Sequence, residues 1–223
     1  MNELLFLLHI CVVMGFGMIA LKMGKTTLTG WVALQAVLAN LFVIKQICFF
    51  NFHITASDVF AIGSIFGLNL LREYFGKAAA LKALWTCFFM MAFFVMMSQI
   101  HLLYVPSPYD TAHPAFMAIL SPSLRLLFAS IAVFFIVQQI DLRMFAYLKE
   151  KFRSVPLTIR NAVSLASTQF LDTFLFSVLG LWGLVASLSD IILVSFIVKL
   201  AVIALMTPLT LFSKRFVGTY DRA

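Results

Sequence analysis

The chain has 223 residues, of which 63% are hydrophobic and only 11% are charged, and its mean hydropathy is +1.04. An average soluble domain has about 45–50% apolar and about 25% charged residues. A chain this apolar cannot cover itself with a water-facing surface, which excludes a soluble globular protein. At roughly 20 residues per spanning helix, the length holds about six to eight spans and no second domain. We therefore expect one integral membrane domain over residues 1–223.

The net charge of +7 raises the question of nucleic-acid binding. That function needs Lys and Arg gathered on one exposed face, whereas here they are scattered in the gaps between apolar runs, so we expect no nucleic-acid partner. The three cysteines, Cys11, Cys48 and Cys87, form no CxxC pair and no Cys/His spacing that suits zinc. We expect neither a metal site nor a cofactor.

Seven apolar runs follow one another along the chain, and most are long enough for a helix to cross a bilayer. They are Glu3–Leu21, Thr26–Phe50, Thr55–Leu71, Ala78–Val105, Ser123–Leu148, Ile159–Leu184 and Leu188–Phe212. The runs are continuous rather than alternating, and an open sheet cannot satisfy its backbone in lipid, so strands are excluded. The predicted fold class is all-α, a polytopic transmembrane helix bundle.

The first run is not typical of a secretory signal peptide. Glu3 stands where a basic segment is needed, and the run has about 19 apolar residues instead of about 7–15. No small-residue cleavage site follows it. We expect it to be a retained helix.

Charges in the gaps between the runs indicate orientation. Lys and Arg occur in every second gap and in the tail: Lys22, Lys25, Arg72, Lys77, Lys82, Lys149, Lys151, Arg153, Arg160, Lys214, Arg215 and Arg222. The gaps at 51–53, 106–122 and 186–187 contain none. Because basic gaps face the cytoplasm, the alternation predicts seven spans with the N-terminus outside and the C-terminus cytoplasmic.

The longest gap, 106–122, reads PSPYDTAHPAFMAILSP. Its prolines exclude a regular helix through most of the segment, although Ala115–Leu120 has room for one short helical turn. Two interpretations stay open for this gap, a lid over a binding site or a plain extracytoplasmic loop.

Two charged residues lie near the middle of apolar runs. They are Asp172 in the sixth run and Lys199 in the seventh, and an ionisable group at the bilayer centre costs at least about 2.5–3.5 kcal/mol. One interpretation is a buried ion pair that locks two helices together. The other is that one or both contact a polar substrate or a coupling proton.

A polar stripe on the sixth run favours the second interpretation. Its members fall within about 140° of one helix face: Asn161, Ser164, Thr168, Gln169 and Asp172. A lone structural pair does not need such a stripe. The pattern predicts a water-filled cavity.

Three other apolar runs also carry polar residues that could face a water-filled cavity. The second contains Asn40 and Lys45, of which Lys45 is near enough to the outer end to snorkel. In the fifth, Asp141 cannot share a helix face with Arg143, so we expect it to point inward. The third run contains Asp58, Gly63, Gly67 and Asn69. Its glycine pair predicts close helix packing, and shortened glycine-rich spans also occur where transporters break helices around a site.

The stretch NLLREYFGKAAA, residues 69–80, is similar to the D-xxx-E-x-YGK-xxA signature of the queuosine precursor transporter family, once called putative vitamin uptake transporters. Further similar segments are ANLFVIKQI (39–47), QQIDLRMFAYLK (138–149), RNAVSLASTQFLDTFLF (160–176) and the lysine of VKL (198–200). They occur in family order over about residues 38–208. Asn69 departs from the pattern, because many members have Asp there. The resemblance implies that residues 1–25 are an additional helix before a six-helix core over 26–212.

The resemblance implies a multi-pass transporter of the bacterial cytoplasmic membrane that imports a 7-deazaguanine for tRNA modification: 7-cyano-7-deazaguanine, its aminomethyl analogue or queuine. A guanine-like ring presents a fork of two N–H donors, which a carboxylate accepts, and a carbonyl that Lys, Asn or Gln can bind. The candidate substrate-binding residues are Asp172, Lys199, Gln169, Asn161, Asp141, Glu73, Asn40, Lys45 and Asn69. The expected mechanism is alternating access through a central cavity.

Three other functions compete with transport. A membrane enzyme needs a nucleophile with its base or clustered interfacial His and carboxylates, which the sequence does not present, so we expect no catalytic residues and no enzyme. A substrate-binding membrane subunit energised by a separate ATPase module, and a channel or structural protein, stay open as alternatives. The sequence is also compatible with a homodimer.

Overall fold

The structure is a computed structural model that describes residues 1–151 and 157–201. Within these ranges the chain is mostly helical, as predicted. The elements are α1 (Asn2–Lys22), α2 (Lys25–Phe42), β1 (Gln46–Phe49), β2 (Phe52–Thr55), α3 (Asp58–Leu102), α4 (His113–Leu120), α5 (Ser123–Lys151), α6 (Leu157–Phe176) and the π-helical turn η1 (Ser177–Leu181). A last helix occupies residues 188–201, so the rest of the seventh run and the basic tail lie outside the described residues.

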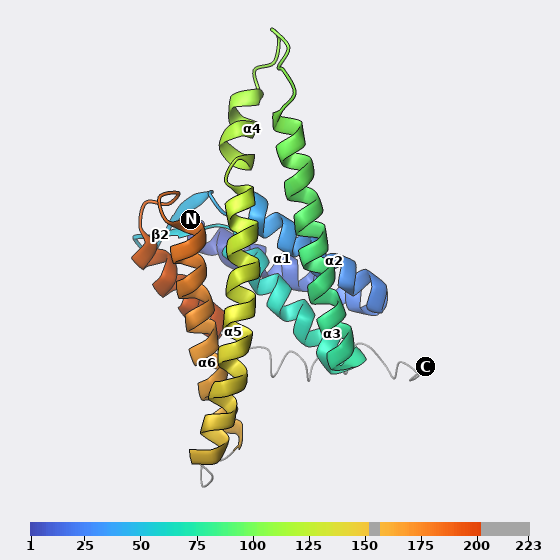
Figure 1. Ribbon diagram of the computed structural model, residues 1–223, viewed down its shortest axis with the longest axis vertical. Helices are drawn as coiled ribbons and strands as arrows, with labels where there is room; N and C mark the ends of the chain where they lie inside the picture. The colour runs from blue at the N-terminus through green and yellow to red at the C-terminus, as the bar shows by residue number, and fades with distance from the viewer. Residues whose placement is uncertain (152–156, 202–223) are drawn as a thin grey trace.

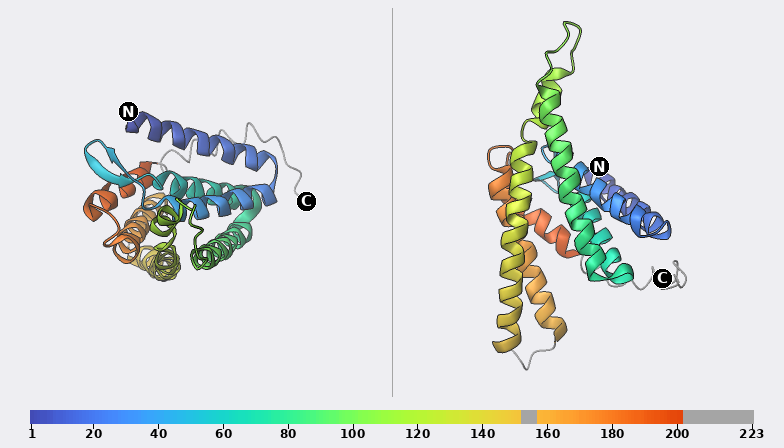
Figure 2. Two further views of the ribbon diagram at one scale, coloured as in Figure 1. Left: turned by 90° about the horizontal axis from the view of Figure 1, so that it is seen from above. Right: turned by 45° about the vertical axis from the view of Figure 1, so that its right-hand side comes forward.

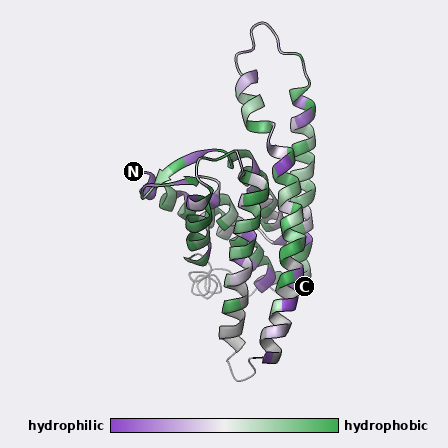
Figure 3. Ribbon diagram, turned by 60° about the vertical axis from the view of Figure 1, so that its left-hand side comes forward, coloured by the Kyte–Doolittle hydropathy of each residue, from purple (hydrophilic) through white to green (hydrophobic). Residues whose placement is uncertain are grey.

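Three helical segments of the described chain are long and apolar enough to cross a bilayer, judged by length and composition: Asn2–Lys22, Asp58–Leu102 and His113–Val137. Large apolar side chains stand on the outer surface of these helices, among them Leu8, Phe16, Phe89 and Phe93. Hydrophobic residues dominate the long helices in Figure 3. A water-soluble protein does not expose so much apolar surface, which agrees with the expected lipid environment.

α3 consists of two helices that meet at Gly76. Its 45 residues would extend roughly 68 Å as one straight helix, about twice the hydrocarbon thickness of a bilayer. Gly76 has φ +83°, a conformation that is open to glycine because it lacks a Cβ, and the chain reverses there (Figures 1 and 2). The third and fourth apolar runs are therefore separate helices, as the basic gap at residues 72–77 predicted.

The exclusion of strands was wrong for residues 46–55, which form an antiparallel hairpin of β1 and β2 with Phe49 opposite Phe52. Phe50 and Asn51 form its two-residue turn, with φ of 46° and 67°. Positive φ at both central positions is typical of a type I′ turn, whose twist matches that of the paired strands. The second run is consequently helical only as far as Phe42.

Three side chains from distant parts of the sequence bind the hairpin's backbone, and one side chain of the hairpin, Gln46, binds the distant backbone of Ala186. The four hydrogen bonds are Asn2 Nδ2 to Cys48 O (2.8 Å), Phe50 N to Glu3 Oε1 (3.1 Å), His53 N to Asp190 Oδ2 (3.0 Å) and Ala186 N to Gln46 Oε1 (2.8 Å). The start of α1, the hairpin and the 182–190 segment thus lie at one end of the bundle. Two of the three gaps without Lys or Arg, 51–53 and 186–187, therefore lie at the same end of the bundle. This is compatible with the prediction that both gaps face the outside.

Two glycines let α3 approach α2 closely. A Cβ placed on Gly67 would lie 2.8 Å from a ring carbon of Trp31, and a Cβ on Gly63 would lie 2.9 Å from Gln35 Oε1. Real Cβ atoms do not approach other atoms this closely. The prediction of close packing at the glycine pair is confirmed, and the approach fixes the wall of the bundle from which Asn40 projects.

We expect Gly67→Ala to destabilise the protein by about 1–3 kcal/mol, the usual cost of overpacking an interior contact. The matched control is Gly30→Ala on α2, where a Cβ would have open space around it. That change should be neutral or stabilising by up to about 1 kcal/mol, since Ala favours a helix. Thermal unfolding of the two purified variants in detergent measures the difference. Equal melting temperatures would show that the close approach does not exist.

Candidate functional site

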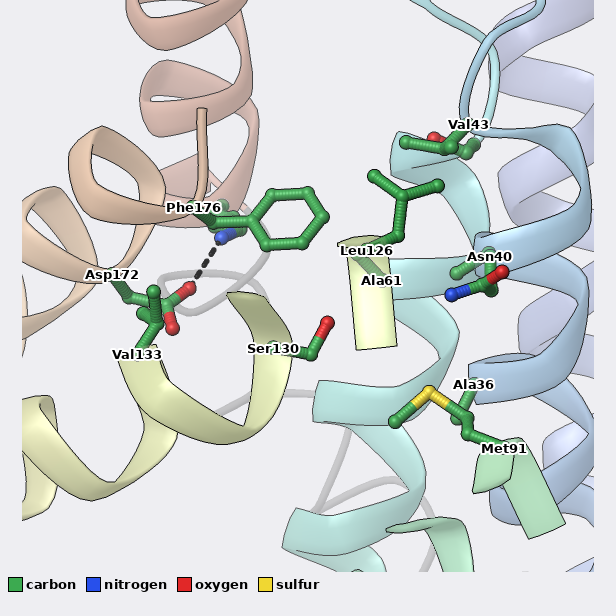
Figure 4. Close-up of a pocket in the computed structure, with 13 residues that line it drawn as sticks. Ala36, Asn40, Val43, Ala61, Met91, Leu126, Ser130, Val133, Asp172 and Phe176 are labelled. Carbon is green, nitrogen blue, oxygen red and sulfur yellow. Dashed lines mark hydrogen bonds and ion pairs between the residues drawn. The ribbon is translucent and has the colours of Figure 1, made fainter. Parts of the chain in front are cut away.

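A cavity of about 230 Å³ lies between α2, α3, α5, α6 and the last helix (Figure 4). Most of its wall is apolar, including Met91 of α3 and Phe176 of α6. Five polar side chains interrupt that wall: Asn40, Ser57, Ser130, Asp172 and Lys199. An apolar cavity with a few convergent polar groups is the usual form of a small-molecule site.

Asp172 and Lys199 meet in the cavity wall as an ion pair. Lys199 Nζ lies 2.9 Å from Asp172 Oδ2 and 3.0 Å from Thr173 Oγ1, so the ammonium bridges two neighbouring residues of α6. The Lys199 side chain is 13% exposed and that of Asp172 is 36% exposed. The carboxylate therefore remains accessible from the cavity. Both residues were predicted as site residues, and the structure brings them together.

Asn40 projects from α2 on the opposite wall, as Figure 4 shows. The residue is 7% exposed, and its Oδ1 has no hydrogen-bond partner among the described residues. Leaving a buried acceptor unpaired costs about 1–3 kcal/mol. Buried polar atoms of this kind need an explanation, and one explanation is that a ligand supplies the missing donor.

The two walls together present complementary groups for a planar polar molecule. Asp172 and Asn40 accept hydrogen bonds from opposite sides, Lys199 donates, and the Phe176 ring offers an apolar face. Among the described residues no three His, Cys, Asp or Glu side chains come together to hold a metal ion. The arrangement is suited to binding a heterocycle that carries N–H donors on two edges.

Four of the remaining predicted residues, Gln169, Asn69, Glu73 and Lys45, do not line this cavity. Gln169 is partly buried on α6, Asn69 is partly buried on α3, and Glu73 is exposed close to the Gly76 turn. Lys45 follows α2 in a turn and lines a separate, more open pocket with His9, Phe42, Ala56 and Phe60. The side chains of Asp141 and Asn161 lie outside the described residues, although their backbones belong to α5 and α6.

Four residues in or beside the site were not predicted from the sequence: Ser57, Ser130, Asp58 and Ser195. Two of them, Ser57 and Ser130, line the cavity. Asp58 accepts a hydrogen bond from Ser195 Oγ at 2.5 Å, which ties the start of α3 to the last helix. Asp58 was recognisable as a charge at the start of an apolar run. Serines are common in transmembrane helices, so their positions alone carry no signal.

Comparisons with known proteins agree with the family resemblance of the sequence. Residues 55–213 match a family model described as "Putative vitamin uptake transporter". The "Probable queuosine precursor transporter" of Bacillus subtilis (strain 168) is 27% identical over 203 residues, which is 90% of this chain and 89% of that protein. No solved structure matches the chain.

Removing one member of the Asp172–Lys199 pair should destabilise the protein, because the other charge then lies partly buried without a partner. We expect Asp172→Asn and Lys199→Gln each to cost about 1–3 kcal/mol, less than for a fully buried pair since Asp172 is partly exposed. The double variant should recover most of that loss. Thermal unfolding of the two single variants and the double variant measures it. Losses that simply add in the double variant would mean that the two charges do not interact.

Proposed function

The chain belongs to the putative vitamin uptake transporter family, and from this premise we propose that it imports a queuosine precursor, a 7-deazaguanine base, across a bacterial cytoplasmic membrane for tRNA modification. The observation that carries the proposal is the cavity with hydrogen-bond acceptors on both walls, Asp172 on one and the unpaired Asn40 on the other. A 7-deazaguanine matches this pattern on both edges.

The base has two recognition edges. Its pyrimidine ring presents N1–H and an exocyclic amine side by side, and in our proposal Asp172 accepts from this fork while Lys199 donates to the neighbouring carbonyl. Its five-membered ring carries a further N–H group, which donates a hydrogen bond to Asn40 Oδ1 in our proposal. Phe176 then packs against the face of the rings. Asn40, Asp172 and Lys199 would thus each have a partner on the base in the loaded state.

The size of the cavity narrows the choice among the three bases. At about 230 Å³ it is smaller than the roughly 300–1,000 Å³ of typical sites for drug-sized ligands. A cavity of this size suits a two-ring base with a short substituent. We therefore propose 7-cyano-7-deazaguanine or its aminomethyl analogue as the substrate, ahead of queuine with its bulkier side arm.

The transport route follows from the predicted topology. We propose seven spans with the N-terminus outside, so that the hairpin end is extracytoplasmic and the Gly76 turn is cytoplasmic. The cavity would open alternately to the two sides. Between the cavity and the cytoplasm, the polar residues Asn69 and Glu73 of α3, Asp141 of α5 and Asn161 of α6 would lead the base inward.

Counterflow in vesicles tests the function itself. Purified protein in liposomes that are preloaded with unlabelled base should accumulate labelled 7-cyano-7-deazaguanine or its aminomethyl analogue, and queuine more slowly. Protein-free vesicles are the control. Absence of counterflow for all three bases would refute the proposal. Uptake that appears only after an ATPase module is added would favour the alternative of a substrate-binding subunit.

Asn40 provides the sharpest test of the binding site. We expect Asn40→Leu to stabilise the protein, because it removes an unpaired buried acceptor, and to lower counterflow about tenfold through the lost hydrogen bond to the base. The matched control is Gln35→Met: Gln35 Oε1 is likewise buried and unpaired among the described residues, but it faces Gly63 and does not line the cavity. Gln35→Met should keep full counterflow. Equal activity of the two variants would remove Asn40 from the site.

A further inference from the structure

A second carboxyl group, that of Asp58, lies near the Asp172–Lys199 pair. It is hydrogen-bonded to the last helix, the helix that also carries Lys199. Ser195 and Lys199 are four residues apart on the last helix and therefore share one of its faces. Ser195 Oγ donates to Asp58 Oδ2 at 2.5 Å, while Lys199 Nζ donates to Asp172 Oδ2 at 2.9 Å. Asp58 is also within range of an attractive electrostatic interaction with Lys199. One helix face thus holds two carboxyl groups that come from α3 and α6.

The charges of this cluster do not balance. With both carboxyl groups ionised, Asp58 and Asp172 carry two negative charges against the single positive charge of Lys199. An unpaired charge is costly to enclose in a low-dielectric interior. From the other neighbouring elements, α1 contributes His9, which packs on the Phe60 ring, and the last helix contributes Asp190, which accepts from His53 N. A third group, Lys45, lines the separate pocket with His9 and Phe60. None of the three is hydrogen-bonded to Asp58 in the described chain, and the cation that attracts Asp58 electrostatically is Lys199.

The hydrogen-bond partners of Asp58 suit both of its protonation states. The Ser195 hydroxyl group is hydrogen-bonded to the carboxyl group, and the Thr55 hydroxyl group lies near enough to interact with it. A hydroxyl group donates to a carboxylate but can also rotate and accept from a carboxylic acid. By contrast, Glu3 and Asp190 accept from the backbone N–H groups of Phe50 and His53, which can only donate and therefore favour the ionised form. Asp58 can gain or lose a proton without losing its partners.

A chain of hydroxyl groups connects Asp58 to the substrate cavity. Thr55 Oγ1, which lies near the Asp58 carboxyl group, accepts a hydrogen bond from Ser57 Oγ at 3.1 Å, and Ser57 lines the cavity. The unpaired Oδ1 of Asn40 belongs to the same cavity. The carboxyl group is thus linked to the place where the base is proposed to bind.

We propose that Asp58 binds a proton that is transported together with the base. This inference rests on the proposed function. The proton enters from the extracytoplasmic side, forms the O–H bond of the Asp58 carboxylic acid and is released to the cytoplasm when that acid ionises again. With Asp58 protonated, the cluster has no net charge, and the bundle can close around base and proton without enclosing an unbalanced charge. The proton gradient thereby drives uptake.

The test compares driven uptake with exchange in the same vesicles. Under an inward proton gradient, the wild-type protein should accumulate labelled 7-cyano-7-deazaguanine above its external concentration, and a protonophore should abolish the excess. Asp58→Asn should lose gradient-driven accumulation about tenfold or more while it keeps counterflow, since Asn cannot exchange a proton. Asp58→Glu should restore part of the driven uptake. Asp190→Asn, the matched control, should retain both activities.

Each alternative result decides against the proposal. Accumulation driven by a sodium gradient at equal pH, or undiminished driven uptake by Asp58→Asn, would overturn it. Absence of wild-type counterflow would refute the proposed function itself, and the proton site with it.

If Asp58→Asn does not fold, Ser195→Ala replaces it: this variant should shift the external pH at which driven uptake is half-maximal and leave counterflow intact. An unshifted pH profile would then overturn the proposal.

Discussion

Gly63 and Gly67, one turn apart on α3, allow its backbone to approach α2 where any side chain would hold the helices apart. Helix association in lipid depends on such contacts, because the surrounding acyl chains are as apolar as the helices and supply no hydrophobic driving force. The approach places Asn40 of α2 and Ala61 of α3 on one wall of the cavity. The opposite wall is then determined by polar contacts, in which Lys199 holds the last helix against α6 and Ser195 holds it against α3.

Much of the fold could be predicted from the sequence, because continuous apolar runs and basic gaps reflect the solvent rather than the details of packing. The reversal at Gly76 coincides with such a gap. The hairpin could not be predicted, since Gln46–Phe49 and Phe52–Thr55 continue the apolar run of α2 and their turn is Phe50-Asn51 instead of the usual Asn-Gly. Asn2, Glu3 and Asp190 bind its backbone, and its own Gln46 side chain accepts a hydrogen bond from Ala186 N; only the tertiary structure creates these contacts.

The site was predictable to a smaller degree. Asp172 and Lys199 were identifiable because ionisable groups in mid-span are costly, and the same reasoning applies to Asp58, whose partner Ser195 gives no signal of its own. The motif match supplied Asn40 as well as Glu73 and Asn69, but it did not indicate which of them share a cavity. Helical periodicity placed Gln169 and Asp172 on one face of α6, yet only Asp172 lines the cavity, because the last helix covers part of that face.

The hydrogen bonds that complete the bundle have a consequence for its biosynthesis. His53 and Asp190 are 137 positions apart in the chain, as are Asp58 and Ser195, and Gln46 and Ala186 are separated by 140. The ribosome therefore delivers the first helices to the membrane long before their partners exist. Until the last helix is inserted, Asp58 lacks Ser195 and Asp172 lacks Lys199. During that time water, lipid headgroups or the insertion machinery must supply partners for these carboxyl groups. A chain that ends before residue 188 would lack both Lys199 and Ser195, the side chains that close this wall of the cavity.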